Sequence, residues 1–249
     1  LQATDATEMV TQALVLCPTR ELADQVSQEI RRFAQRLDNL RVLSVCGGRP
    51  YRDQVQAFTQ GVHVVVGTPG RIKQHLSDGN LKLKQLKVLV LDEADRMLDM
   101  GFIDDVTTII RRTPPTRQTL FFSATFSDEI SALSAQVQRD AHRVTTEAEG
   151  APDVLEQRYF QCEPEDRHDL VVSLLAQHRQ SSTLIFCETR DDCDALAAHL
   201  CKRGAVALAL HGQIEQRDRD EIMLQFAHGS ASVLVATNVA ARGLDIPSL

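Results

Sequence analysis

The chain has 249 residues, of which 43% are hydrophobic, and a formal net charge of −7. This length suits one large or two medium domains with buried cores. No apolar run approaches the ~20 residues of a membrane span, and residues 1–5 lack the charged and apolar regions of a secretory signal peptide. We therefore expect a cytoplasmic protein that does not bind membranes.

The basic residues are mostly arginine, although the chain as a whole is acidic. Only five of the 27 basic residues are lysine, so most carry the planar fork that matches phosphate. A net charge of −7 argues against nucleic-acid binding by bulk electrostatics. Nucleic acid, if bound, has to be held at specific corners of the fold and by backbone amides.

The six cysteines form no Cys-x-x-Cys pair and have no nearby histidine at zinc-ligand spacing. Cys17, Cys46 and Cys187 each end an apolar run, which favours buried reduced thiols over disulfides or metal ligands. We expect a reducing compartment and no structural metal.

Apolar runs of strand length alternate with stretches of helical periodicity along the chain. The runs cover residues 13–17, 42–46, 62–67, 88–92 and 120–123, and then residues 183–187, 205–210 and 233–237. Strands this continuously apolar are typical of parallel sheets that are buried on both faces and joined by helices. The sequence therefore predicts an α/β fold.

The second half of the chain repeats the first. Cys17-Pro18-Thr19-Arg20 returns as Cys187-Glu188-Thr189-Arg190, 170 positions later, and Val66-Gly67-Thr68 returns as Val235-Ala236-Thr237, 169 positions later. Small, acidic and helix-breaking residues collect between the halves. We predict two similar domains, residues 1–147 and 155–249, joined by a linker of residues 148–154.

Polar residues follow the predicted strands, at the edge where open parallel sheets bind ligands. Thr19 and Thr68 are candidate helix N-caps, and Arg20 and Arg71 stand beside amides that attract phosphate. The second half repeats the pattern at Thr189 with Arg190 and at Thr237 with Arg242. One such pair alone is more typical of ordinary capping, but the repetition favours consecutive contacts to a sugar-phosphate backbone.

Two further motifs indicate nucleotide hydrolysis. Asp92-Glu93 follows one predicted strand, where an aspartate can hold Mg²⁺ and a neighbouring carboxylate can orient the attacking water. Acidic pairs at this place also occur as plain helix caps. The combination with Ser123-Ala124-Thr125 after another strand is much more specific. No lysine follows a glycine, so the chain shows no phosphate-binding P-loop.

Together these motifs resemble the DEAD-box RNA helicases over essentially the whole chain. They are Pro18-Thr19-Arg20-Glu21-Leu22, Gly47-Gly48, Thr68-Pro69-Gly70-Arg71, Asp92-Glu93-Ala94-Asp95, Ser123-Ala124-Thr125 and residues 236–245. The resemblance implies two RecA-like domains in tandem that clamp ATP between them and RNA across them. Residues 95–102 and 215–220 are most similar to one bacterial group, which finds ribosomal RNA through a separate C-terminal domain.

The resemblance also implies a role for individual residues. Asp92 would coordinate Mg²⁺ through water, Glu93 would position the hydrolytic water, and Ser123 and Thr125 would link hydrolysis to strand separation. The other implied positions are nucleotide contacts at Gly243 and Asp245, RNA contacts at Pro18, Thr19, Arg20, Gly48, Thr68, Gly70 and Arg71 in the first domain, and RNA contacts at Gly212, Gln216, Arg219 and Thr237 in the second.

The chain departs from the family pattern where phosphate is held. The Gly-Lys-Thr loop and the upstream adenine-reading motif are absent, and no His-Arg pair continues into the His-Arg-x-Gly-Arg motif that carries the arginine finger. We therefore expect a segment that is cut at both ends, with both domains truncated at the outer ends of the chain. Alone it should hydrolyse ATP negligibly.

Three functions remain open at this point. The leading one is the core segment of an ATP-dependent RNA helicase that unwinds RNA duplexes locally, in ribosome assembly. The second is a nucleotide-independent RNA-binding module without a P-loop, and the third is a DNA translocase of the same superfamily. The coding sequence upstream of Leu1 distinguishes the first two.

Overall fold

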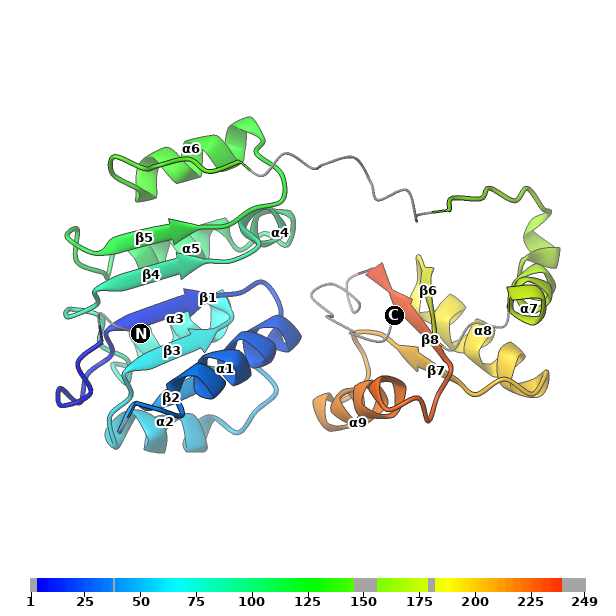
Figure 1. Cartoon of the computed structure of the whole chain (residues 1–249), viewed down its shortest axis with the longest axis horizontal. Helices are drawn as coiled ribbons and strands as arrows, with labels where there is room; N and C mark the ends of the chain where they lie inside the picture. Colours follow the sequence, from blue (N-terminus) through cyan, green and yellow to red (C-terminus); the bar gives the residue numbers. More distant parts are fainter. Residues whose placement is uncertain (1–3, 38, 146–155, 179–181, 239–249) are drawn as a thin grey trace. The chain divides into compact units, whose positions relative to one another are not determined.

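The structure is a computed structural model that describes residues 4–37, 39–145, 156–178 and 182–238 (Figure 1). The chain divides into two compact units, Leu1–Ala141 and His142–Leu249. Each unit has a parallel sheet with helices between its strands. The predicted α/β class, with two such domains in tandem, is therefore confirmed. The predicted linker, residues 148–154, lies outside the described residues.

Strands and helices alternate in the first unit. In chain order they are β1 (Ala13–Leu16), α1 (Arg20–Ala34), β2 (Val42–Val45), α2 (Tyr51–Thr59), β3 (Val64–Gly67), α3 (Pro69–Ser77), β4 (Val88–Leu91), α4 (Ala94–Asp99), α5 (Ile103–Ile110), β5 (Gln118–Phe121) and α6 (Asp128–Val137).

The sheet of the first unit has the order β2-β3-β1-β4-β5, and all of its pairings are parallel. The last residue of β1, Leu16, is level with Gly67 of β3 and with Leu91 of β4. Leu91 is in turn level with Phe121, the last residue of β5. The carboxyl ends of the strands therefore meet at one edge, so the loops that follow them lie close together.

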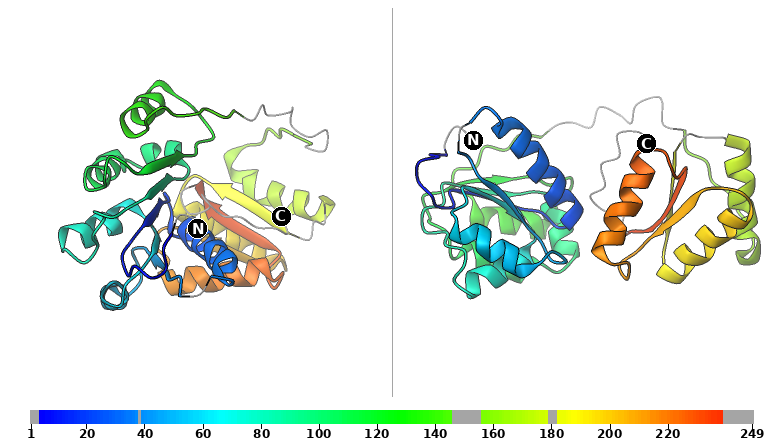
Figure 2. Two further views of the ribbon diagram at one scale, coloured as in Figure 1. Left: turned by 60° about the vertical axis from the view of Figure 1, so that its left-hand side comes forward. Right: turned by 90° about the horizontal axis from the view of Figure 1, so that it is seen from below.

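Alternate residues of β1 point to opposite faces of this sheet. Leu14 and Leu16 belong to the core that includes Ile72 of α3 and Val106 of α5, whereas Val15 packs with the residues of α1 on the other face. Figures 1 and 2 show α1 on the face opposite α3 and α5. The central strand is thus buried on both sides, as its apolar sequence predicts.

The second unit repeats this plan on a smaller scale. Its elements are the 3₁₀ turn η1 (Pro164–Asp166), α7 (Arg167–His178), β6 (Thr183–Cys187), α8 (Arg190–Lys202), β7 (Ala207–Leu210), α9 (Gln216–Ala227) and β8 (Val233–Thr237). The sheet order within the described residues is β6-β8-β7, and both pairings are parallel. Leu196 and Leu200 of α8 pack on one face of the sheet and Phe226 of α9 packs on the other.

All eight predicted strands are present, with small differences at their ends. β6 and β8 have the predicted bounds, while β7 begins later because the amide of Ala205 closes the turn at the end of α8 by bonding to the carbonyl of Leu200. The expected burial on both faces is wrong for two strands, β5 and β6. In β5, Leu120 is 37% exposed, and in β6, Cys187 is only half-buried. Both strands lie at sheet edges within the described residues, where they lack a neighbour on one side.

The described cysteines are free thiols, and Cys17 and Cys46 are fully buried. Burial raises the pKa of both thiols, that of Cys46 to about 11. Both thiols therefore stay protonated and behave as small apolar groups. Among the helices of the described residues, none combines the length and the apolar character that a bilayer crossing requires.

Candidate nucleotide and RNA sites

The predicted site residues of the first unit follow the carboxyl ends of its strands. Thr19 follows β1, Gly48 follows β2, Thr68 follows β3, Asp92 follows β4 and Ser123 follows β5. Because these strand ends are in register, the structure brings the residues to one edge of one sheet. This edge is where open parallel sheets bind ligands.

Asp92 and Glu93 lie where β4 passes into α4. The amide of Asp92 donates to the carbonyl of Leu16, 3.0 Å away, which anchors the turn to β1. Glu93 has a left-handed backbone with φ of 50°, a conformation that is uncommon for a residue with a side chain and that recurs at functional sites. The turn places two adjacent acidic residues at the ligand-binding edge.

Both carboxylates have a raised pKa. For Asp92 the cause is burial, which a hydrogen bond from the amide of Glu93 partly offsets. For Glu93 the cause is also burial, which the positive charge of Arg96 opposes. Nη1 of Arg96 lies 2.9 Å from both carboxylate oxygens of Glu93, so this guanidinium fixes the orientation of the carboxylate.

Asp95 joins the two hydrolysis motifs. Its Oδ2 accepts hydrogen bonds from the amide and from the hydroxyl of Thr125, each of 2.9 Å. The hydroxyl of Ser123 donates to the carbonyl of Thr125 at 2.6 Å. Although burial acts to raise the pKa of Asp95, the bonds from Thr125 hold it below its usual value. The ends of β4 and β5 are thereby linked by a charge-assisted contact.

The two predicted phosphate-binding corners of the first unit, which begin at Thr19 and Thr68, differ in detail from one another. Thr19 is a true N-cap, because its hydroxyl accepts from the amide of Leu22 at 3.3 Å. Thr68 also stands at the N-cap position, before Pro69, but its side chain makes no capping hydrogen bond. This leaves the Thr68 hydroxyl uncommitted to its own helix, which suits a hydroxyl that binds a ligand.

The other predicted RNA residues of this unit lie on the same edge. Gly48 has φ of +80°, which glycine adopts without strain. Arg20, Gly48 and Gly70 are exposed, whereas Pro18 is buried behind the corner. Arg71 is half-buried, and its guanidinium lies 5.4 Å from the centre of the Tyr51 ring.

In the second unit, Thr189 caps α8 by accepting from the amide of Asp192 at 3.1 Å, as Thr19 caps α1. Gly212 is exposed, and Thr237 ends β8 level with Cys187. The side-chain amide of Gln216 donates to Asp220, and Arg219 donates to the carbonyl of His211. Gly243, Asp245 and Arg242 lie outside the described residues.

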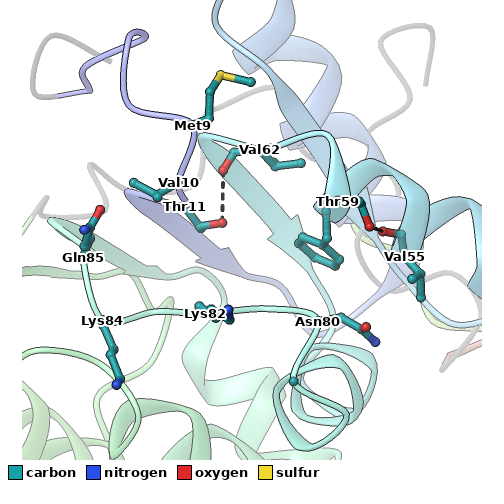
Figure 3. Close-up of a pocket in the computed structure, with 13 residues that line it drawn as sticks. Met9, Val10, Thr11, Val55, Thr59, Val62, Asn80, Lys82, Lys84 and Gln85 are labelled. Carbon is teal, nitrogen blue, oxygen red and sulfur yellow. Dashed lines mark hydrogen bonds between the residues drawn. The ribbon is translucent and has the colours of Figure 1, made fainter.

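A cavity of about 540 Å³ lies elsewhere in the first unit (Figure 3). Its lining includes Val10 and Thr11, just before β1, and Val62, just before β3, so it belongs to the amino edge of the sheet. The Thr11 hydroxyl donates to the carbonyl of Val62 at 3.1 Å. None of the predicted site residues lines this cavity.

Asp95 and Arg96 are absent from the predicted set of catalytic residues. Asp95 belongs to the motif that the sequence shows, but its partner Thr125 is 30 residues away. Arg96 stands three residues after Glu93, a spacing that brings side chains together on a helix and that signals this ion pair from the sequence.

The fold and the site together define a tandem pair of RecA-like parallel sheets, with polar motifs at the carboxyl ends of the strands. The comparisons with known proteins identify its family. The family model described as DEAD/DEAH box helicase matches residues 1–133, and that of the helicase conserved C-terminal domain matches residues 166–249. The chain belongs to the DEAD-box helicases, and the resemblance seen in its motifs is confirmed.

Individual relatives agree with this assignment. The ATP-dependent RNA helicase DbpA of Escherichia coli is 49% identical over 249 residues, covering 100% of this chain and 54% of that protein. The bacterial group that residues 95–102 and 215–220 resemble is the DbpA group. CshA of Limosilactobacillus reuteri is 40% identical over 236 residues, covering 94% of this chain and 47% of that protein. The chain thus spans about half the length of these relatives.

Among solved structures, that of S. cerevisiae Dbp5 bound to RNA and ADP BeF3 matches with a TM-score of 0.88 and 29% identity. The match covers 100% of this chain and 63% of that one. A DEAD box protein from Methanococcus jannaschii matches with a TM-score of 0.55 and 34% identity over 98% of this chain.

Proposed function

We propose that this chain forms the core of an ATP-dependent RNA helicase, in which ATP hydrolysis drives the local unwinding of RNA duplexes. The observation that carries the proposal is the pair of hydrogen bonds between Asp95 and Thr125. They join the turn that holds Asp92 and Glu93 to the loop that holds Ser123 and Thr125. These bonds provide a direct route by which a change at the hydrolysis motif can reach the second motif.

The residues after β4 fit Mg²⁺ bound with ATP. Mg²⁺ prefers oxygen ligands, keeps several waters, and is held by one or two carboxylates together with substrate phosphates. Within the described residues there is no cluster of three or more metal-binding side chains, and the single carboxylate of Asp92, together with substrate phosphates, is enough for this mode of binding. When bound, the ion neutralises charge that develops on the phosphates. Gly243 and Asp245 are further proposed nucleotide contacts.

Glu93 is the proposed residue that orients the attacking water. A carboxylate has to be ionised to accept a hydrogen bond from that water. Arg96 favours the ionised form and holds both oxygens at 2.9 Å, so it keeps the acceptor in one orientation. Asp92, which directly follows β4, is the proposed residue that holds the ion.

The proposed RNA surface consists of helix starts and glycine turns rather than of a basic patch. Thr19 and Thr68 are the N-cap residues of α1 and α3, and the exposed Arg20 stands beside the first of them. Helix starts attract phosphate, which also suits an acidic chain. In the second unit the proposed contacts are Gly212, Gln216, Arg219 and Thr237.

We further propose that the RNA is ribosomal RNA and that the protein acts in the cytoplasm, in ribosome assembly. The proposal follows from what the resemblance of residues 95–102 and 215–220 to one bacterial group implies. It is tested by comparing ribosomal RNA fragments with unrelated duplexes as activators of ATP turnover.

The test of the core proposal is Glu93→Gln in the complete protein that contains this chain. We expect ATP turnover to fall by at least about a hundredfold, because the amide is a poor substitute for a general base. RNA binding in the presence of a non-hydrolysable ATP analogue should be retained. Glu129→Gln, at an exposed position in the first turn of α6, is the matched control and should leave turnover unchanged.

Other results would favour the other functions. Full turnover in Glu93→Gln, with Glu129→Gln behaving alike, would remove the proposed role of Glu93. RNA binding that ignores ATP, without turnover in the parent protein, would favour an RNA-binding module. Equal stimulation by single-stranded DNA would favour a DNA translocase.

A further inference from the structure

Gln54 is a buried polar residue that belongs to none of the motifs. It lies in α2 and is only 4% exposed. Its amide nitrogen donates to the carbonyl of Cys46 at 3.0 Å. Its amide oxygen lies 2.8 Å from Nε2 of His75 and 3.3 Å from Nη1 of Arg71. One side chain therefore joins three different segments of the first unit.

The hydrogen bonds around Gln54 and His75 fit one assignment of donors and acceptors. Because the Gln54 nitrogen faces a carbonyl, its oxygen is the atom that accepts from His75, so His75 carries its proton on Nε2. The unprotonated Nδ1 then faces the amide nitrogen of Asn80, 3.4 Å away. His75 is fully buried, and burial followed by the charge of Arg71 lowers its pKa to about 4. The ring is thus neutral near pH 7 and serves as a fixed donor.

The segments that Gln54 joins are two of the proposed RNA corners. The carbonyl of Cys46 directly precedes the turn of Gly47 and Gly48, and Arg71 ends the corner that begins at Thr68. The hydrogen bond to Cys46 fixes where the turn leaves β2. The hydrogen bond to Arg71 fixes the guanidinium of the other corner.

Tyr51 holds the same guanidinium from a second direction. The Tyr51 ring stacks on His75 with centroids 4.4 Å apart and planes 9° apart, and Arg71 lies 5.4 Å above the Tyr51 ring. Asn80 donates to the Tyr51 hydroxyl at 2.9 Å, which keeps the ring in place. Arg71 is thus confined by the ring and by the Gln54 amide, and its conformational entropy is lost before any ligand binds.

We propose that Gln54 is a positioning residue for RNA: it holds the turn of Gly47 and Gly48 and the guanidinium of Arg71 as one preorganised phosphate-binding surface. This inference rests on the proposed RNA-binding function. Gln54 itself is buried, so it acts through the two corners without touching RNA.

The test measures RNA affinity in the complete protein. The probe is a labelled single-stranded polyuridine oligonucleotide, bound in the presence of a non-hydrolysable ATP analogue. Gln54→Met keeps the volume of the side chain and removes its polar atoms. We expect the dissociation constant to rise about tenfold, as for the loss of one hydrogen bond to a charged group. Gln56→Met, at an exposed position of the same helix, should leave it unchanged.

A double-mutant cycle with Arg71→Met separates positioning from a general structural role. If Gln54 acts in part through Arg71, the loss of affinity in the double variant should be smaller than the sum of the two single losses. The slope of log affinity against log salt should also fall by about 0.7 in Gln54→Met, which corresponds to one phosphate contact on a single strand. The KM for ATP without RNA should not change.

Two outcomes would overturn the inference. They are unchanged RNA affinity in folded Gln54→Met, and losses that simply add in the double variant. If Gln54→Met does not fold, Gln54→Asn provides the same cycle, because it keeps an amide that is one methylene too short to reach Cys46 and Arg71 together. A parent protein that fails to bind RNA at all would instead refute the proposed function.

Discussion

Arg96 forms an ion pair with Glu93 and influences the ionisation that the proposed role of Glu93 requires. The Arg96 side chain is 38% exposed and the Glu93 side chain 29%, so water screens the pair and its contribution to stability is small. Its effect on the ionisation of Glu93 is more direct, because burial raises the pKa of this carboxyl and the guanidinium opposes that rise. The pair therefore extends the pH range in which Glu93 is ionised.

Arg96→Gln should move the acid limb of the pH profile of kcat to higher pH. Without the guanidinium, burial acts unopposed and the pKa of Glu93 rises further. The carboxylate is ionised only above its pKa, so turnover should fall more at the acid end of the range than at pH 8. The measurement is kcat of the complete protein against pH, with saturating ATP and RNA.

Arg111→Gln is the control for this change, because Arg111 is an exposed arginine that follows α5. It should leave the acid limb where it is. An acid limb that does not move in Arg96→Gln would show that the arginine has no influence on the ionisation that limits turnover.

Some contacts of single residues can be predicted from the sequence, and others cannot. The cap at Thr19 follows from local chemistry, because a threonine before a helical stretch can reach the amide three residues ahead. The partners of Asp95 and Gln54 cannot be found in this way. Asp95 binds Thr125, whereas Gln54 binds Cys46, His75 and Arg71. These partners meet only once the sheet has formed.

At the scale of elements, strand edges explain the main differences between expectation and structure. An apolar run predicts a strand, but burial on both faces requires a neighbour on each side. β1 lies between β3 and β4 and is buried throughout most of its length, whereas β5 pairs only with β4 among the described residues. Position within a sheet depends on the whole topology, which a single run of residues does not contain.

The link between the ends of β4 and β5 gives a prediction at this scale. Ser123→Ala combined with Thr125→Ala removes both hydroxyls but keeps the amide of Thr125, which still donates to Asp95. We expect ATP turnover to stay within about threefold of the parent, since Asp92 and Glu93 are untouched. Duplex separation should slow by about tenfold or more, as for a lost hydrogen bond to a charged group.

The measurement compares ATP turnover with the unwinding of a labelled RNA duplex, under the same conditions and in the complete protein. Thr116→Ala, at an exposed position before β5, serves as the control and should change neither rate. Equal losses of turnover and unwinding in the double variant would contradict a coupling role for these residues.

At the scale of the whole molecule, repetition is the feature that the sequence reveals best. Thr19 follows β1 and Thr189 follows β6. Each caps the helix that comes next by accepting from the amide three residues ahead. A repeated motif at a constant offset predicts repeated structure, since each copy needs the same buried strand before it.

The isolated 249 residues should hydrolyse ATP negligibly. The carboxylates proposed to bind the ion and to orient the water are present, but none of the five lysines follows a glycine, so no P-loop neutralises the phosphates. An arginine finger alone contributes about 10³–10⁵ in rate in related systems, and the chain lacks the motif that carries it. The measurement is RNA-stimulated phosphate release by the purified chain, beside the complete protein at equal concentration. Far-ultraviolet circular dichroism would show that the chain is folded. Robust turnover by the folded chain would prove that other groups in it stabilise the transferring phosphoryl.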